Sequence, residues 1–273
     1  MRITFLVLGI VAAIFVAAPI FIVVPMSFST LPSLEFPPPS FWTGHYAAFF
    51  RNVTWTGPMI NSFVIAIGTT ILTMVLVTPA AFAMVRHRFA GRSLLNMFLL
   101  TPLVVPHIVM AVGYFSYFGR IGLLQSYVGV ILAHTCLTTP VAFLTVSAAL
   151  KGFDRNLERA AQSLGAPPIL AFLVVTVPVL KPAFLVSALL SFVHSFDETT
   201  VALFISGRDV ATLPKRMFDA LRLQADPVLS VAATLLFGIV LAIFAGMAVH
   251  QIIAARRVTR ERAPATALRQ AVS

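Results

Sequence analysis

The sequence predicts an all-α integral membrane protein with six transmembrane helices. Of its 273 residues, 59% are hydrophobic and only 10% are charged, whereas about a quarter of the residues in a soluble domain are charged. The apolar residues form six continuous runs, and each run has roughly the 20 residues that a helix needs to cross a bilayer. The basic residues lie in short groups between these runs, which is typical of loops that set membrane topology.

The six runs define the predicted spans, which lie within a transmembrane domain of residues 1–254. They cover residues 5–26, 59–85, 94–118, 127–150, 183–206 and 228–254. The first run is longer than the apolar region of a signal peptide, which has about 7 to 15 residues, so we expect an uncleaved span. Prolines within or near the spans should kink the helices and free carbonyls that neighbouring helices must satisfy. These prolines are Pro79, Pro102, Pro106 and Pro140.

Two connections between spans carry structural signals of their own. Residues 31–58 are rich in proline and aromatic side chains, and we expect an external segment there with aromatic residues at the membrane interface. These aromatic residues are Trp42, Tyr46 and Trp55. In residues 207–227, Thr212 can cap a helix that has Pro214 in its first turn, so we expect a short external amphipathic helix.

The basic residues favour a cytoplasmic N-terminus. In that orientation thirteen Lys and Arg side chains lie on the cytoplasmic side and six on the other, as the positive-inside rule requires. Both termini and residues 151–182 are then cytoplasmic, and residues 255–273 form a basic tail near anionic lipid. We therefore attribute the net charge of +10 to basic residues that set the membrane topology. We expect no nucleic-acid partner, because no basic face carries interleaved aromatic side chains.

Residues 151–182 form a polar and amphipathic segment between two apolar runs, and the rest of the chain is organised around it. Asp154 can cap a short helix, and Gly165 stands where a left-handed residue would end it. Pro168 suits the first turn of a second helix. The apolar run 169–177 has nine residues, too few to cross a bilayer, so we expect it to lie flat or to dock onto another surface.

The sequence contains no local motif of a catalytic or metal centre. No GxxxxGK[ST] loop, HExxH helix or GxSxG elbow occurs, so we expect no catalytic residue and no metal site in this chain. The single cysteine, Cys136, lies in an apolar run and fits a small buried side chain. His107 and His134 lie on separate spans, where interhelical hydrogen bonds are their expected role.

Polar side chains recur in the fifth predicted span, at Ser191, His194, Ser195, Asp197 and Glu198. On a helix, His194 would share a face with Asp197 and Glu198, three and four residues later. A carboxylate in the middle of a membrane costs about 2.5 to 3.5 kcal/mol, so this pair needs water or a partner. Either a path for a cation or a structural pairing with His194 or another subunit meets that need. Tyr114 and Tyr117, at the outer end of the third span, fit an interfacial belt or cation recognition.

The segment 151–182 resembles the cytoplasmic loop of the membrane subunits of binding-protein-dependent ABC importers. That loop has the pattern Glu-Ala-Ala, three residues, Gly, nine residues and Ile-x-Leu-Pro. Here Ala160 and Ala161 precede Gly165 by the same spacing, and the pattern closes at Pro178. In the family this loop supplies a coupling helix that docks in a groove of the ATPase subunit.

The resemblance implies a set of residues that couple this chain to an ATPase. Arg159 occupies the position of the family glutamate, and Glu158 lies one position earlier, so either side chain could make the ionic contact. The implied coupling residues are Glu158, Arg159, Ala160, Ala161, Gly165, Ala166, Pro168, Phe172 and Pro178.

Three further stretches are similar to the second membrane subunit of spermidine/putrescine importers. They are SFDETTVALFISG at 195–207, TLPKRMFDALR at 212–222 and ADP at 225–227. The resemblance implies a type I ABC importer permease fold, with a coupling helix between helices 4 and 5, in the bacterial inner membrane. It also implies a polyamine or another small polar solute as cargo. The implied path residues are Tyr114, Tyr117, His194, Ser195, Asp197 and Glu198.

The same resemblance implies partners. These are a second homologous permease, two copies of an ATP-binding subunit and an extracytoplasmic solute-binding protein. ATP and Mg²⁺ would be held by the ATP-binding subunits, so no cofactor is expected in this chain. Two alternatives remain open. One is the same importer class with an aminophosphonate, an opine or an amino-acid derivative as cargo. The other is a stand-alone channel or an intramembrane enzyme that uses the histidines with Asp197.

Overall fold

The computed structural model describes residues 2–31, 35–223, 226–247 and 249. The chain divides into two compact units, residues 1–49 with 224–273 and residues 50–223. Among the described residues, five helices are long and apolar enough to cross a membrane, and a bent pair makes a sixth if it counts as one span. The predicted all-α class is therefore confirmed.

The first unit contains the two terminal spans. α1 runs over Arg2–Met26, which confirms the first predicted span, and α2 runs over Gly44–Arg51. The last span is described as a helix over Val228–Met247, which confirms its beginning. Residues 250–273, which include the predicted end of that span and the basic tail, lie outside the described residues.

Three long helices pack against one another and form the core of the second unit. They are α3 (Val53–Arg86), α6 (Tyr127–Lys151) and α9 (Val177–Phe196). Buried apolar side chains of this core are Val77, Ala81, Val146, Leu150 and Leu180. The hydroxyl groups of Thr73 and Thr138 lie 2.6 Å apart and link α3 to α6, as polar side chains between packed transmembrane helices do.

α3 begins six residues before the predicted second span. Asn52 caps it, because the side-chain oxygen of Asn52 accepts a hydrogen bond of 2.9 Å from the backbone N–H of Thr54. Trp55, which we expected at the membrane interface, is buried in the first turns of α3. Pro58 is the sixth residue of α3, so the helix continues through it at the loss of one backbone hydrogen bond.

The third predicted span is broken into two helices. α4 (Arg92–Leu100) continues into a 3₁₀ turn, η1 (Thr101–Leu103), and α5 begins only at His107 and runs to Ile121. The two halves are bent by 102°, a far sharper break than the kink that we expected from Pro102 and Pro106. Pro106 precedes the first residue of α5, and its ring disfavours the helical conformation of the residue before it.

The fifth predicted span is also interrupted. α9 ends at Phe196, and a short helix, α10 (Thr200–Ile205), follows three residues later. The carboxylate of Glu198 accepts a hydrogen bond of 2.9 Å from the backbone N–H of Val201, so this acid caps α10 instead of continuing α9. The predicted amphipathic helix after it is confirmed as α11 (Leu213–Leu223).

The predicted segment 151–182 forms a helical hairpin, and its second helix continues without a break into the fifth span. α7 covers Asn156–Ser163, and α8 covers Pro168–Ala171. A π-turn, η2 (Phe172–Thr176), then joins α8 directly to α9, so residues 168–196 form one helical stretch. The wider turn accommodates Pro178, whose ring would clash with the carbonyl four residues earlier in a regular α-helix.

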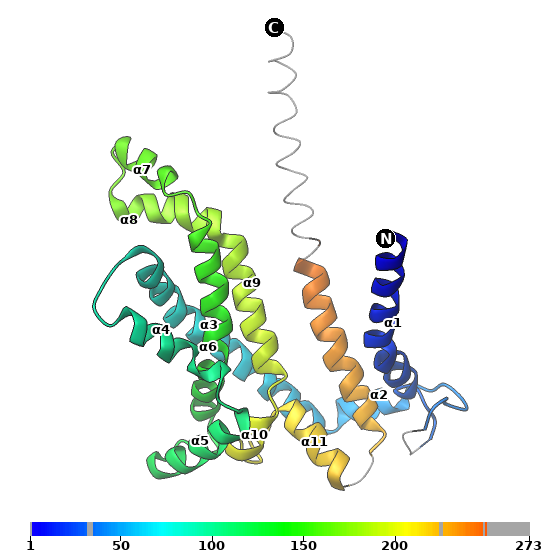
Figure 1. The fold of residues 1–273 in the computed structure, drawn as a ribbon. Helices are drawn as coiled ribbons and strands as arrows, with labels where there is room; N and C mark the ends of the chain where they lie inside the picture. The colour runs from blue at the N-terminus through cyan, green and yellow to red at the C-terminus, as the bar shows by residue number, and fades with distance from the viewer. Residues whose placement is uncertain (1, 32–34, 224–225, 248, 250–273) are drawn as a thin grey trace. The chain divides into compact units, whose positions relative to one another are not determined.

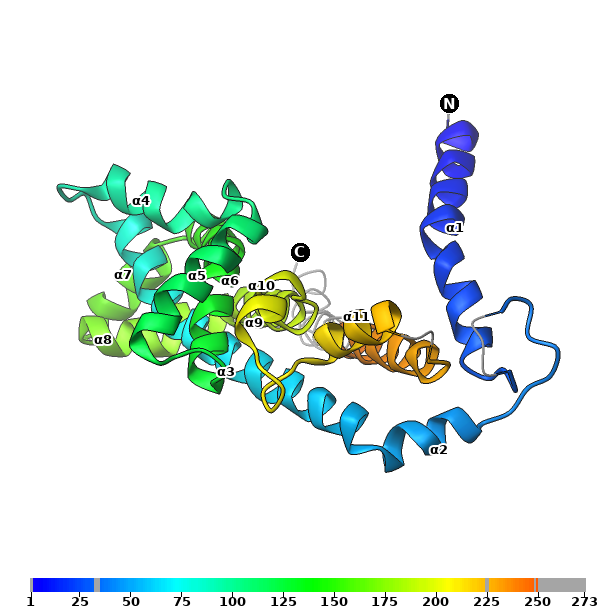
Figure 2. The same cartoon turned by 90° about the horizontal axis from the view of Figure 1, so that it is seen from below.

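The functional elements lie at opposite ends of the second unit. α7 and α8 form one end, and α10 and α11 lie toward the other (Figure 1). α10 packs against α5. The view from below shows α10 near the end of α9 (Figure 2). α9 therefore connects the two ends of this unit.

Candidate functional site

The turn between α7 and α8 has the geometry that the sequence predicts. Asp154 accepts a hydrogen bond of 2.9 Å from the backbone N–H of Asn156 and so caps the first turn of α7. Gly165 has a φ of 92°, and the N–H of Ala166 donates to the carbonyl of Ala161 over 3.1 Å. This closes α7 with a left-handed glycine. A Cβ at residue 165 would meet no atom within 4 Å, so the left-handed backbone conformation alone favours glycine there.

A buried ion pair fixes α7 to α3. One guanidinium nitrogen of Arg86, the last residue of α3, lies 2.9 Å from each carboxylate oxygen of Glu158. The hydroxyl group of Thr176, in the π-turn, also donates to Glu158. The side chains of Arg86 and Glu158 are 14% and 9% exposed. Arg86 lies over the ring of Phe82, with its guanidinium carbon 4.8 Å from the ring centroid. Three segments of the chain are thus tied together at one point.

Arg159, the next residue of α7, is exposed. Its guanidinium group has one weak contact, 3.5 Å from the side-chain oxygen of Asn156. Glu158 is buried and Arg159 is exposed, so Arg159 is the side chain that is available to a partner. The hairpin also exposes large apolar side chains, since Leu164 is 90% exposed and Ile169 is 76% exposed.

The remaining predicted coupling residues divide between the surface and the core. Phe172 packs edge-to-face on Phe82, with ring centroids 5.0 Å apart. The residues on the outer surface of the hairpin are Ala160, Gly165, Pro168 and Pro178, and Ala161 and Ala166 are half-buried. Arg86 and Thr176 were missed as site residues. Only the basic character of Arg86 was visible in the sequence, and nothing local indicated that it would reach α7.

A second polar cluster lies at the far end of α9. His107 Nδ1, at the start of α5, is 3.1 Å from Glu198 Oε2. The rings of His107 and His194 meet edge-to-face, with centroids 6.0 Å apart. One potential ligand atom from each of His107, His194 and Glu198 lies within 4.8 Å of the other two. The proximity of His194 to Glu198 is confirmed, although a helix break rather than a continuous helix produces it.

This cluster borders a hollow of about 390 Å³, called here the polar hollow. Asp197 lines it and is exposed, whereas Glu198 is buried. The two adjacent carboxylates therefore have different environments, one open to the hollow and one held by His107 and by a backbone N–H. Apolar side chains of α6 and α9 form the rest of the wall.

Three other predicted path residues do not line the polar hollow. Ser195 is buried, and its hydroxyl oxygen is 2.9 Å from His134 Nδ1, so this pair links α9 to α6 as we expected of His134. Tyr114 stacks on Phe118, with centroids 5.3 Å apart, and packs against the core. Tyr117 is 61% exposed and lies on α5 outside the hollow.

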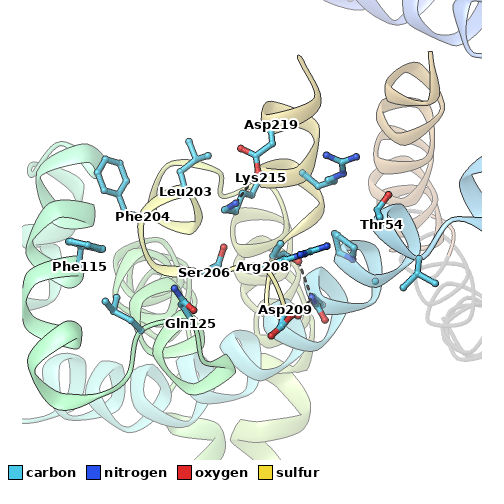
Figure 3. A pocket seen from close by; sticks show the side chains of 18 residues that line it. Thr54, Phe115, Gln125, Leu203, Phe204, Ser206, Arg208, Asp209, Lys215 and Asp219 are labelled. Atoms are coloured by element: carbon cyan, nitrogen blue, oxygen red, sulfur yellow. Dashed lines mark hydrogen bonds and ion pairs between the residues drawn. The ribbon is translucent and has the colours of Figure 1, made fainter. Parts of the chain in front are cut away.

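A larger pocket of about 810 Å³ lies between α3, α10 and α11 (Figure 3). Charged side chains of both signs line it, namely Arg208, Asp209, Lys215, Arg216 and Asp219. Lys215 and Asp219 form an ion pair of 2.9 Å within α11. The side-chain amide of Asn61 donates to the carbonyls of Asp209 and Ala211 over 2.9 and 3.0 Å and so fixes the connection before α11 to α3.

Comparison with known families decides what this arrangement of helices is. Residues 76–259 match the family of binding-protein-dependent transport system inner membrane components. That range includes the hairpin, the polar hollow and α11. The chain belongs to this family. It is a multi-pass inner-membrane permease of an ABC importer, a transport subunit rather than an enzyme.

Characterised relatives extend the match over most of the permease. The spermidine/putrescine transport system permease protein PotC of Haemophilus influenzae is 30% identical over 72% of this chain and 77% of its own length. The putrescine transport system permease protein PotI of Escherichia coli is 29% identical over 88% of this chain and 86% of its own. The trehalose transport system permease protein SugB of Mycobacterium tuberculosis is 32% identical over 61% of each chain.

A solved structure shows the same fold. A chain of a bacterial ABC transporter that imports the acidic polysaccharide alginate superposes with a TM-score of 0.68, covering 92% of the permease and 96% of that chain. The sequence identity is 16%, so this likeness concerns the fold alone. It agrees with the type I importer permease fold that the resemblance of the hairpin implied.

Proposed function

We propose that the permease forms the inward path for a small cationic amine of the polyamine class. The observation that carries this proposal is the pair of carboxylates at the polar hollow, Asp197 and Glu198. Asp197 is exposed to the hollow, and the hollow adjoins the core helix α9. A cation is attracted to such a site because the apolar walls weaken screening of the negative charge. The names of PotC and PotI point to the same class of cargo.

The proposed mechanism is mechanical. The hairpin α7–α8 docks on an ATP-binding subunit, and its outward Arg159 faces an acidic group there. Because η2 joins α8 to α9 without a break, movement of the hairpin moves α9, at whose other end the polar hollow lies. The ion pair between Arg86 and Glu158 adds α3 to the moving body. Closure of the ATPase pair would thus switch the access of the hollow between the two sides of the membrane.

The proposed assembly contains a second homologous permease, two ATP-binding subunits and an extracytoplasmic solute-binding protein. ATP and Mg²⁺ belong to the ATP-binding subunits. We assign the hairpin and both termini to the cytoplasm, which follows from the distribution of the basic residues. The charged pocket beside α11 then faces the solute-binding protein. A structural relative has been solved in complex with a periplasmic protein that carries its ligand.

Site-directed labelling tests this orientation. The chain has one native cysteine, Cys136, and a Cys136→Ala background removes it. Ser163→Cys in the hairpin should react with a membrane-impermeant maleimide only in inverted vesicles or opened cells. Arg208→Cys in the outer pocket should react in intact spheroplasts. The reverse pattern of labelling would contradict the proposed orientation.

Uptake by variants tests the proposed cargo. In cells that express the complete importer, Asp197→Asn should lower uptake of labelled putrescine or spermidine at least about tenfold, because loss of one charge contact costs about 1.4 kcal/mol or more. Asp197→Glu, which keeps the negative charge at the hollow, serves as the matched control. Undiminished polyamine uptake by both Asp197→Asn and Glu198→Gln at normal expression would rule out the acidic site. Preferential competition by trehalose would assign a sugar instead.

A further inference from the structure

We propose that His107, His194 and Glu198 form a binding site for a divalent transition-metal ion such as Zn²⁺. The three residues come from the start of α5, the last turn of α9 and the connection between α9 and α10. Their potential ligand atoms lie within 4.8 Å of one another. Two imidazole nitrogens and one carboxylate oxygen are a ligand set that Zn²⁺ takes in sites with an open position.

The distances between the ligand atoms suit a small ion. Bonds of about 2.0 to 2.1 Å in tetrahedral geometry place two ligand atoms roughly 3.3 Å apart. His107 Nδ1 and Glu198 Oε2 are already 3.1 Å apart. The His194 nitrogen lies within 4.8 Å of both atoms and would move closer when the ion binds. The ion would replace the hydrogen bond between His107 and Glu198, and the proton on Nδ1 would pass to the other ring nitrogen or to water.

The surroundings of the three side chains favour a bound cation. Glu198 Oε1 accepts the N–H of Val201, which orients the carboxylate and leaves Oε2 directed at His107. Such outer contacts hold metal ligands in place. His194 Nε2 is a buried nitrogen without a hydrogen-bond partner among the described residues. Asp197 lines the same polar hollow and is not one of the three ligands, so its carboxylate stays open to a cationic amine.

The ligand types select the class of metal. Imidazole nitrogen suits Zn²⁺, Cu²⁺, Co²⁺ and Ni²⁺, whereas Mg²⁺ and Ca²⁺ prefer sites made of oxygen ligands only. Three protein ligands leave a coordination position that faces the polar hollow, where water can bind. We expected no metal site from the sequence, because the histidines lie on separate spans without a local ligand motif. The bend before α5 and the break after α9 bring them together.

Cobalt binding by the full-length permease in detergent, with any affinity tag removed, tests the site. Titration with Co²⁺ should give one ion per chain and a visible absorption spectrum of low coordination number. His107→Gln and His194→Gln should each weaken binding at least about 10- to 100-fold, which is the loss seen even for outer contacts. His87→Gln, an exposed histidine at the end of α3, should bind as the wild type does, and millimolar Mg²⁺ should not displace Co²⁺.

Electron paramagnetic resonance of the wild-type protein with one equivalent of Cu²⁺ keeps the proposal testable if a variant does not fold. The spectrum should show coupling to two imidazole nitrogens. Absence of saturable Co²⁺ binding would overturn the proposal. So would binding unchanged in both histidine variants, or a copper spectrum with fewer than two imidazole ligands.

Discussion

Glu158 and Arg86 form an ion pair that is buried between α7 and α3, and its removal should loosen the hairpin. Breaking one partner of such a pair costs about 3 to 5 kcal/mol, because the other charge is left uncompensated. We therefore expect Glu158→Ala to lower the thermal unfolding temperature of the purified permease clearly. Arg159→Ala, one residue away but exposed, should change it little. Equal effects of the two variants would contradict the inward placement of Glu158.

Arg159 should act on the partner rather than on the fold. Because it is exposed and makes only a weak contact with Asn156, Arg159→Glu should leave expression and thermal stability close to those of the wild type. Its reversed charge should weaken co-purification of the ATP-binding subunit and lower transport. Co-purification at several salt concentrations measures this, since an ionic contact weakens with added salt. Unchanged co-purification would remove Arg159 from the docking surface.

Variants of Gly165 distinguish a requirement for the left-handed backbone conformation from a requirement for space at this turn. A β-branched residue in the left-handed region costs roughly 1 to 2 kcal/mol, whereas asparagine tolerates it. No atom crowds the position, so Gly165→Asn should retain transport and Gly165→Val should lose much of it. Uptake measured at matched membrane expression decides between them. Similar uptake by both variants would show that the left-handed turn is not required.

The sequence predicts single residues well where their role is local. The cap at Asp154 and the left-handed Gly165 follow from spacing alone, and both are confirmed. The pairing of Glu158 with Arg86 joins residues 72 positions apart, and no local pattern indicates such a contact. For the same reason, the sequence left the choice between Glu158 and Arg159 open, and only the ion pair of Glu158 with Arg86 shows which of the two faces inward.

At the scale of elements, η2 sets the rotation of the hairpin relative to α9. Deleting Val174 should convert the π-turn to regular helix and rotate α8 by about 100°, the angle that one residue occupies in an α-helix. The variant should still insert in the membrane, but transport should fall strongly because the docking surface is turned away. Val174→Ala keeps the register and should transport normally. Normal uptake by the deletion variant would contradict rigid coupling through η2.

Helix length was predictable, but helix breaks were not. Hydropathy located five spans among the described residues, and a sixth if the bent pair is one span, because the need to satisfy backbone hydrogen bonds in lipid dictates long helices. It could not show that α9 ends at Phe196, since Asp197 and Glu198 fit either a helix or a cap. Prolines signalled a kink in the third span, yet not a bend of 102°. These breaks create the polar hollow, so the site was less predictable than the fold.

At the scale of the whole molecule, α9 links the hairpin α7–α8 at one end of the larger unit to the polar hollow at the other. We propose that an ATPase drives this connection. A channel would conduct its solute without ATP, and its hairpin would need no partner. The family match and the continuous helix from Pro168 to Phe196 therefore support the same account.

The most direct test is ATP-driven uptake by the reconstituted importer. The complete complex in proteoliposomes, with ATP inside and cargo-loaded binding protein outside, should accumulate labelled polyamine against its gradient. Accumulation should stop when ATP is replaced by a non-hydrolysable analogue, and also when this chain carries Gly165→Arg. Equal polyamine flux with and without hydrolysable ATP would contradict the account.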